Sequence, residues 1–295
     1  MSDMHGKTVL ITGANQGIGK ASAISLGKMG ASLVLVCRDG EKGRAAVADI
    51  KRETGRGDVE LILADMGSQA DVRRAAAEFL AKHDRLDVLL NNAGVLVTSR
   101  RTTKDGIEET FAINHLGYFL LTNLLLDVLK KSAPSRIVSV SSDAHKGSRM
   151  QWDDLQFERA KFRAFSVYSQ SKLANILFTT ELAKRLEGTG VTANCLHPGV
   201  IASGFGRTYG GFTSVLVKVA SPFLITPEKG ARTSVYLASS PEVAGVSGKY
   251  FKNCKETRAD RGAYEDGAPK RLWEVSASLT GLGASGGASH KGAAA

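Results

Sequence analysis

Short apolar runs alternate with longer segments of helical periodicity along most of the chain. Six runs rich in Val, Ile and Leu have the length of strands buried on both faces: 7–12, 32–37, 59–63, 86–91, 136–141 and 191–196. Apolar residues at helical spacing lie between or beside them, over 19–30, 41–54, 69–82, 105–131 and 166–186. This alternation predicts an α/β fold, a doubly wound parallel sheet of the Rossmann type with helices on both faces.

The chain shows no internal repeat and no linker between domains. We therefore expect one domain over residues 1–275. Residues 276–295 are almost all Gly, Ala and Ser with two leucines, too little apolar surface to offset the entropy of ordering them, so they predict a flexible tail. A composition of 43% hydrophobic and 23% charged residues excludes an intrinsically disordered chain.

The formal net charge of +10 is compatible with nucleic acid, an anionic membrane or a phosphorylated small molecule as partner. The basic residues are scattered in runs of at most two and form no reading motif, which argues against nucleic acid. No run of 18 apolar residues predicts a membrane span, and residues 1–7 are too polar for a signal peptide. Three distant cysteines give no disulfide or zinc framework, so we expect a cytoplasmic protein without a bound metal.

A glycine-rich turn follows the first predicted strand and opens a helix. It contains Gly13, Asn15, Gln16, Gly17, Ile18 and Gly19. Glycines permit close backbone approach, and a helix start offers free N–H groups to a pyrophosphate. The spacing Gly-x-x-x-Gly-x-Gly differs from the common dinucleotide fingerprint. The turn either binds a dinucleotide or connects strand and helix without a ligand.

The second predicted strand ends where the adenosine ribose of a dinucleotide is read. Cys37 occupies the place of the acid that binds a free 2′-hydroxyl, and Arg38 follows it, which favours NADP over NAD. Asp39 keeps NAD open, and Arg38 is alternatively a solvated surface cation. Asp65 ends the third strand, placed either to accept a hydrogen bond from adenine or to form an Asx turn.

Small and polar residues end the fourth and fifth strands. Asn92, Ala93 and Gly94 either let a cofactor lie flat on the strand ends or form an ordinary turn. Ser141 and Ser142 either bind a substrate carbonyl or belong to a turn.

Tyr168 and Lys172 are four residues apart, on one helix face. A free phenol has a pKa of about 10, so we expect the Lys172 ammonium and an oxidised nicotinamide to lower the Tyr168 pKa toward neutrality. The alternative is an interfacial Tyr beside a snorkelling Lys. Asn114, a poor helix former inside a long helical segment, predicts a functional kink or an exposed side chain.

Together the motifs resemble the classical short-chain dehydrogenase/reductase family over about residues 7–251. The segments that carry the resemblance are TGANQGIG, NNAG, Asn114, the serine of the fifth strand, YSQSK and Pro198-Gly199. The segments CRD, INHLGYFLL, SVSSDAHK, WDDL and SKLANILFTTELAKRL are similar to the retinol dehydrogenase group. Members of that group usually carry an N-terminal apolar anchor, whereas here the first predicted strand begins at residue 7.

The resemblance implies roles for these residues in hydride transfer between a nicotinamide and a carbonyl or alcohol carbon. Ser142 polarises the carbonyl, Tyr168 exchanges the proton, Lys172 lowers the Tyr168 pKa and binds the nicotinamide ribose, and Asn114 holds a water in a proton relay. Pro198, Gly199 and Ser203 meet the carboxamide end of the cofactor. The helices 105–131 and 166–186 form a two-fold interface in this family, which implies a homodimer or homotetramer.

Residues 200–226 combine four glycines with apolar side chains. They predict a mobile lid over an apolar substrate, or alternatively a segment packed on the protein body or another subunit. A non-catalytic dinucleotide-binding redox sensor is the rival function, and the joint presence of Ser142, Tyr168 and Lys172 argues against it.

Overall fold

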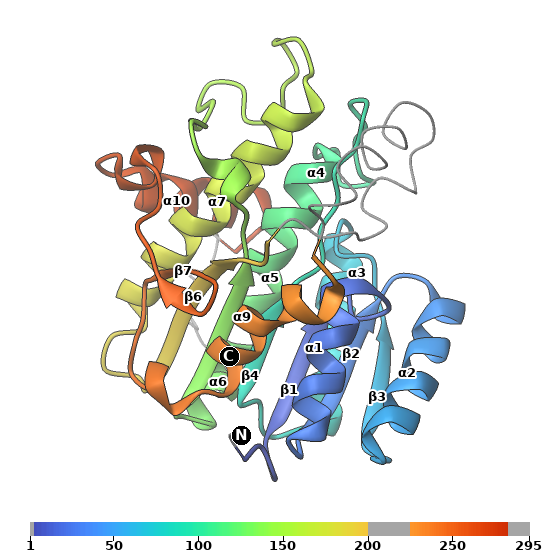
Figure 1. Cartoon of the computed structure of the whole chain (residues 1–295). Helices are drawn as coiled ribbons and strands as arrows, with labels where there is room; N and C mark the ends of the chain where they lie inside the picture. Colours follow the sequence, from blue (N-terminus) through green and yellow to red (C-terminus); the bar gives the residue numbers. More distant parts are fainter. Residues whose placement is uncertain (1–2, 200–224, 283–295) are drawn as a thin grey trace, which may run out of the picture.

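An eight-stranded sheet forms the centre of the computed structural model, which describes residues 3–199 and 225–282 (Figure 1). The strands lie in the order β3-β2-β1-β4-β5-β6-β7-β8, and all neighbours are parallel except β7 and β8. Their bounds are β1 (Thr8–Thr12), β2 (Ser32–Cys37), β3 (Val59–Leu63), β4 (Val88–Asn91), β5 (Ser135–Val140), β6 (Val191–His197), β7 (Tyr250–Lys252) and β8 (Lys255–Glu256). The predicted doubly wound parallel sheet is confirmed.

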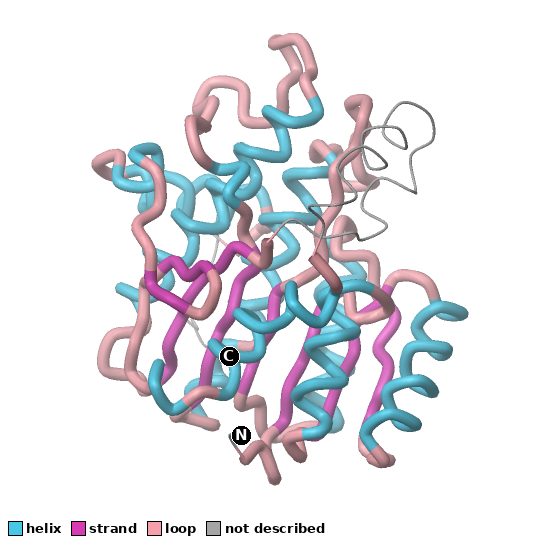
Figure 2. Tube along the Cα trace, viewed as in Figure 1, coloured by secondary structure: helices cyan, strands magenta, loops and turns pink. Residues whose placement is uncertain are grey.

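Helices cover both faces of the sheet (Figure 2). One face carries α1 (Gly17–Lys28), α2 (Gly40–Thr54) and α9 (Pro227–Ser239). The other carries α3 (Gln69–Lys82), α5 (Gly117–Leu124), α6 (Leu126–Lys131) and α7 (Ala164–Arg185). Strand β1 shows the consequence for sequence: Val9 and Ile11 enter the core under one layer and Leu10 the core under the other. The central residues of a strand covered on both faces are therefore apolar without alternation, as the pattern indicated.

The strand order reverses between β1 and β4, which both leave the sheet at the same edge. Thr12 Oγ1 there accepts hydrogen bonds from the backbone N–H groups of Asn92 (2.9 Å) and Ala93 (3.0 Å). The end of β1 is thereby fixed to the turn after β4. Ligands of open α/β sheets bind at such a reversal point, outside the carboxyl ends of the strands.

The predicted helix over 105–131 is broken into parts. It begins at α4 (Glu109–Phe111), passes through a π-helical turn, η1 (Ala112–Leu116), and continues as α5 and α6. Asn114 lies in the π-helical turn and is fully buried. The predicted exposed side chain is therefore wrong, and the α-helix is interrupted at Asn114 as the other alternative predicted, while the functional role of Asn114 stays a prediction.

The predicted flexible tail is wrong for its first residues. Helix α10 (Ala268–Leu279) continues past residue 276, and both Ser276 and Thr280 are fully buried. The backbone carbonyls of Leu279 and Thr280 accept hydrogen bonds from Gln69 and Arg73 of α3. Composition alone missed this order because the small residues form the last turn of α10, and the helix is held by earlier residues such as Trp273. Residues 283–295 of the predicted tail lie outside the described residues.

Helix α10 packs against α5 and α7. Its Trp273 ring lies 4.9 Å from the Phe119 ring and 6.0 Å from the Phe178 ring, centroid to centroid. The Arg185 guanidinium lies 4.3 Å from the centroid of the Trp273 ring, opposite a π face. Helix α10 thus covers part of α5 and α7 within one chain, and the homo-oligomer that the resemblance implies stays a prediction.

Candidate active site

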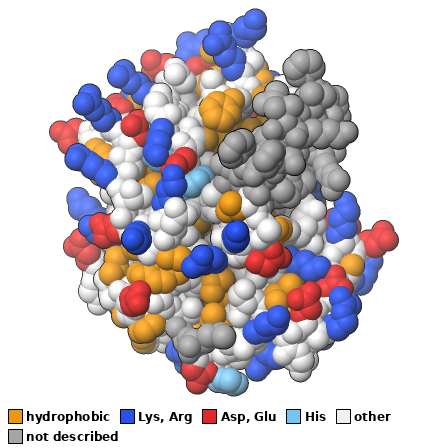
Figure 3. Space-filling view, in the orientation of Figure 1, with side chains coloured by type: hydrophobic (Ala, Val, Ile, Leu, Met, Phe, Trp, Pro, Cys, Tyr) orange, Lys and Arg blue, Asp and Glu red, His pale blue; other side chains and the backbone are white. Residues whose placement is uncertain are grey.

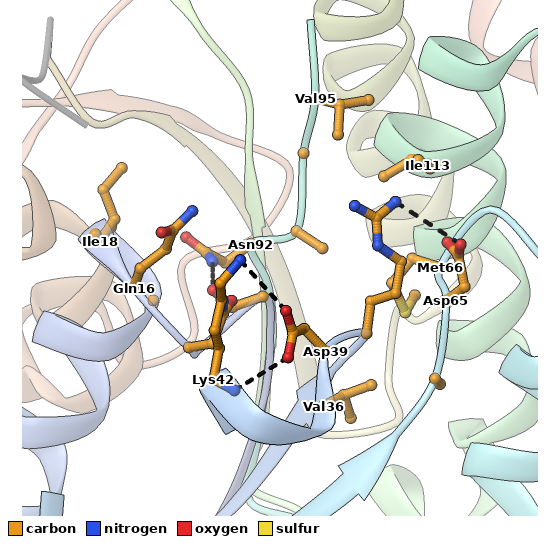
Figure 4. Close-up of a pocket in the computed structure, with 18 of the residues that line it drawn as sticks. Gln16, Ile18, Val36, Asp39, Lys42, Asp65, Met66, Asn92, Val95 and Ile113 are labelled. Atoms are coloured by element: carbon orange, nitrogen blue, oxygen red, sulfur yellow. Dashed lines mark hydrogen bonds and ion pairs between the residues drawn. The ribbon is translucent and has the colours of Figure 1, made fainter. Parts of the chain in front are cut away.

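A cavity of about 310 Å³ opens at the reversal point of the sheet (Figure 4). It is lined by all of the predicted dinucleotide-binding residues from the first four strand ends: Gly13, Asn15, Gln16, Gly17, Ile18, Gly19, Arg38, Asp65, Asn92, Ala93 and Gly94. Sequence reasoning missed other lining residues, among them Lys42, Met66 and Ile113. Lys42 had a detectable signal, since it follows Asp39 by three residues at the start of a predicted helix.

The glycines of the turn are required by close backbone packing. A Cβ atom on Gly13, whose φ is +68°, would lie 2.8 Å from the Ala93 Cα, and one on Gly19 would lie 2.4 Å from the Gly13 carbonyl oxygen. The Gln16 side chain makes no capping hydrogen bond at the start of α1. The first-turn N–H groups and the positive end of the helix therefore face the cavity, which suits a pyrophosphate.

Charged side chains surround the adenosine end of the cavity. Arg38 is 55% exposed, and its guanidinium lies 3.8 Å from the Asp65 carboxylate. Asp39 caps α2 by accepting the Lys42 backbone N–H, and the Lys42 ammonium lies 3.3 Å from its carboxylate (Figure 4). Burial raises the pKa of Cys37 to about 11, so the expected place of a ribose-binding acid holds a neutral thiol.

Asp65 and Asn92 combine structural contacts with a place in the cavity wall. Asp65 Oδ1 accepts the Gly67 backbone N–H at 2.9 Å, which confirms the Asx turn. Asn92 Nδ2 donates to the carbonyl oxygens of Thr12 and Gly13, at 2.8 and 3.2 Å. For both Asp65 and Asn92, a structural turn contact is thus compatible with a place in the cofactor cavity.

Tyr168 and Lys172 lie on one face of α7, with the Lys172 Nζ 5.5 Å from the centroid of the Tyr168 ring. Lys172 is only 2% exposed and donates to the Val140 carbonyl oxygen at 3.1 Å. Ser141 Oγ donates to the Lys172 carbonyl oxygen, which fixes α7 to the end of β5.

Burial dominates the ionisation of this pair. Burial raises the pKa of Tyr168 to about 12, and the Ser142 hydroxyl acts in the opposite direction through a hydrogen bond. Burial also lowers the pKa of Lys172 to about 7. Without a cofactor, burial therefore shifts both pKa values against the charged forms. The expected lowering of the Tyr168 pKa included the charge of an oxidised nicotinamide and stays a prediction for the cofactor-bound protein.

Of the two serines after β5, Ser141 and Ser142, it is Ser142 that contacts Tyr168. Its Oγ accepts the Ala144 backbone N–H at 3.1 Å and is hydrogen-bonded to Tyr168. Ser141 is buried against Lys172 instead. Both the turn contact and the placement beside the phenol are present at Ser142.

The π-helical turn brings Asn114 to the same site. Asn114 Oδ1 accepts the Val95 backbone N–H at 2.7 Å, and its Nδ2 donates to the Val95 carbonyl and to Ser171 Oγ, both at 2.9 Å. A Cβ atom on Gly94 would lie 3.4 Å from Asn114 Oδ1 and 3.5 Å from Lys172 Nζ. Gly94, Asn114 and Lys172 therefore meet where the cofactor cavity approaches the Tyr168 helix.

Pro198 and Gly199 directly follow β6, at the same edge of the sheet as the other candidate residues. Ser203 and residues 200–224 of the predicted lid lie outside the described residues. Thr226, its last residue, accepts the Lys229 backbone N–H and caps α9.

The chain belongs to the short-chain dehydrogenases, a family of oxidoreductases: the family model for short chain dehydrogenase matches residues 7–210. It is 47% identical to human retinol dehydrogenase 14 over 95% of this chain and 88% of that protein. Human retinol dehydrogenase 13 is 46% identical, over 94% of this chain and 85% of that protein. The chain is a retinol dehydrogenase-like member of the family.

Solved structures agree with this assignment. An uncharacterized protein from Mycobacterium paratuberculosis has a TM-score of 0.77 at 32% identity, covering 95% of this chain and 96% of its own. The Pseudomonas aeruginosa RhlG/NADP active-site complex has a TM-score of 0.68 at 27% identity, covering 84% and 95%. The cavity, the glycine turn and the family together support a nicotinamide dinucleotide as cofactor.

Three further features bear on a membrane span, a bound metal and nucleic acid. Within residues 3–199 and 225–282, no helix is long and apolar enough to cross a membrane, and no group of three acidic, His or Cys side chains is arranged to hold a metal. Lys and Arg side chains are spread among acidic ones over the face drawn in Figure 3. That face offers no concentrated basic surface for nucleic acid.

Proposed function

We propose that the protein is an NADP(H)-dependent carbonyl reductase or alcohol dehydrogenase with Tyr168 as the acid and base. The observation that carries the proposal is the hydrogen-bonded pair of Ser142 and Tyr168, placed with Lys172 and Asn114 beside a cavity suited to a dinucleotide. A dinucleotide sensor would need the cavity alone.

The residues divide the chemistry among them. Ser142 Oγ accepts the Ala144 N–H, and its hydroxyl, now hydrogen-bonded to Tyr168, would turn its proton from the phenol to a substrate oxygen. Tyr168, with its pKa near 12, holds its proton at neutral pH and can donate it to the same oxygen as a carbonyl is reduced. Asn114 and Lys172 lie behind Gly94 of the cavity wall, where a proton relay would continue. When bound, the nicotinamide supplies the hydride or accepts it.

The preference for NADP rests on the charges around the ribose end. Arg38 and Lys42 are cations at the cavity rim that a 2′-phosphate could contact. The Asp39 carboxylate is engaged by the N–H of its own helix, which makes it a poorer acceptor for a ribose hydroxyl. Arg38 and Lys42 would exchange their present carboxylate partners for the phosphate.

An apolar substrate is the second part of the proposal. Relatives at 43–47% identity are named retinol dehydrogenases 11 to 14, and a retinoid is a large apolar alcohol or aldehyde. The predicted lid over 200–226, with its apolar residues and glycines, would cover such a substrate.

The test measures oxidation of NADPH and of NADH against aldehydes and ketones of graded size and polarity. We expect turnover with NADPH, fastest for large apolar carbonyls. Tyr168→Phe should bind NADPH with unchanged affinity, and its turnover rate should fall by a factor of about 10²–10⁴, because the substitution keeps the ring and removes the hydroxyl proton. Tyr236→Phe, a tyrosine on α9 bonded to Glu242, is the matched control.

Each part of the proposal has an outcome that refutes it. An unimpaired Tyr168→Phe enzyme refutes the acid–base role. Cofactor binding without turnover of any carbonyl or alcohol favours the redox sensor. The predicted homodimer or homotetramer in the cytoplasm is a separate proposal, and light scattering that shows only monomer overturns the assembly.

A further inference from the structure

His145 lies three residues after Ser142 and is fully buried. Its Nδ1 is 2.6 Å from the Ser142 carbonyl oxygen, and its Nε2 accepts the Asp260 backbone N–H at 3.0 Å. Because a backbone N–H only donates, Nε2 has to be the unprotonated nitrogen of the ring. The proton of the neutral imidazole is then on Nδ1, which donates to the Ser142 carbonyl.

Asp143, the residue after Ser142, is also held by several hydrogen bonds. The Asp143 backbone N–H donates to His197 Nδ1 at 3.1 Å. Its carboxylate accepts hydrogen bonds from the Tyr250 hydroxyl at 2.9 Å and from the Lys252 ammonium at 2.6 Å. The peptide that follows Ser142 is therefore tied to β6 and β7, while the Ser142 carbonyl is tied to His145.

The partner of His145 comes from a distant part of the chain. Asp260 lies between β8 and α10, and its carboxylate accepts the Gly147 backbone N–H at 2.9 Å. The Tyr250 ring meets the His145 ring edge to face, with centroids 5.0 Å apart. The imidazole thus connects the C-terminal part of the described chain to the backbone of the serine beside Tyr168.

We propose that His145 is a positioning residue for Ser142, which fixes the serine backbone so that its hydroxyl stays aligned with Tyr168. This inference rests on the proposed function, because it requires Ser142 to act on the substrate oxygen. The hydrogen bonds of the imidazole join Ser142 to Asp260, so His145 acts through the Ser142 backbone. A misplacement of about 1 Å at a reacting group can cost on the order of 10² in rate.

Two amide variants separate the two ring nitrogens. In His145→Asn the side-chain amide can still donate to the Ser142 carbonyl, whereas in His145→Gln the longer side chain can accept the Asp260 N–H but places no donor at the Nδ1 position. We expect kcat to fall about 10-fold or more in His145→Gln, to be substantially retained in His145→Asn, and KM for NADPH to stay unchanged in both. Equal kcat losses in the two variants, or none, would overturn the proposal.

Loss of stability is controlled separately. Phe79→Leu, a buried ring on α3 that stacks on His83, should lower the midpoint of urea unfolding without the kcat loss. A kcat loss in Phe79→Leu as large as that in His145→Gln would mean that destabilisation alone explains the effect, and the proposal would fail.

Substitutions of Asp260 test the role of His145 independently. Its φ of −72° suits proline, so Asp260→Pro removes the N–H that orients His145, while Asp260→Ala removes only the carboxylate. We expect kcat to fall in Asp260→Pro and to change little in Asp260→Ala. The opposite order would refute a role for the imidazole tautomer. Ser142→Ala tests the proposed function separately from the His145 and Asp260 variants. If Ser142→Ala retains full activity, the proposed function itself fails.

Discussion

Burial of Lys172 should destabilise the folded protein in the absence of cofactor. Lys172 is 2% exposed, and its ammonium donates to the neutral Val140 carbonyl oxygen. Burial lowers its pKa from 10.5 to about 7. At about 1.4 kcal/mol per pKa unit, this change corresponds to about 4 kcal/mol of lost folding free energy at pH 7.

Lys172→Met removes the charge and keeps a long flexible side chain. The substitution loses the hydrogen bond to the Val140 carbonyl, worth about 1 kcal/mol, but that oxygen keeps a second donor, Asn175 Nδ2, at 3.1 Å. We therefore expect an inactive variant that is about 3 kcal/mol more stable than the unmodified protein at pH 7. Urea unfolding of the two cofactor-free proteins measures the difference.

The dependence on pH identifies the cause. Between pH 7 and 10.5 the unfolded chain binds the Lys172 proton and the folded chain does not, so the unmodified protein gains stability as the pH rises. The advantage of Lys172→Met should therefore shrink steadily over this range. Lys184→Met, an exposed lysine on the same helix, is the control and should show no such trend. Equal or lower stability of Lys172→Met at pH 7, or an advantage independent of pH, would refute the reasoning.

Three further substitutions test other parts of the structure. Arg38→Ala should raise KM for NADPH at least 10-fold and leave KM for NADH within about 2-fold, since a charged hydrogen bond is worth about 1.5–3 kcal/mol; equal effects on both cofactors would contradict the NADP assignment. Trp273→Ala should lower the free energy of urea unfolding by about 3 kcal/mol, because it removes the contact of α10 with α5 and α7. Asp87→Asn should cost about 1.5–3 kcal/mol near neutral pH, because its buried carboxylate accepts hydrogen bonds from Lys7 and Arg85, whose own charges are partly exposed. Since these contacts lower the Asp87 pKa, the difference should disappear as the pH falls below its ordinary value of 3.8, which acid titration of stability would show.

The sequence pattern predicted the elements whose burial is set by local periodicity. Strands β2 and β3 and helix α3 agree with the predicted ranges 32–37, 59–63 and 69–82 at both ends. The three residues of β7 and the helices α9 and α10 were not predicted. Short strands and helices rich in small residues carry little periodic signal, and their stability comes from contacts that are distant in the sequence, such as Trp273 on Phe119.

The residues of the candidate site also fall into those that the sequence could place and those that it could not. Residues at strand ends could be placed together because parallel strands bring their carboxyl ends to one edge, and Gly13, Arg38, Asp65 and Gly94 do share one cavity. His145 carried no comparable signal. Its contact with Ser142 is local, but its tautomer is set by Asp260, 115 residues further along the chain.

The ionisation of Tyr168 shows where reasoning from residue types ends. A lysine four residues away predicts a more acidic phenol only if the ammonium stays charged and close to the phenol oxygen. Here Lys172 lies over the ring, donates to a backbone carbonyl and itself loses affinity for its proton. Desolvation opposes both charges at once, so the protein alone favours a neutral phenol beside an easily deprotonated lysine. Such a pair is prepared to donate a proton, which fits carbonyl reduction, whereas alcohol oxidation would need additional positive charge at the site before the phenol could act as a base.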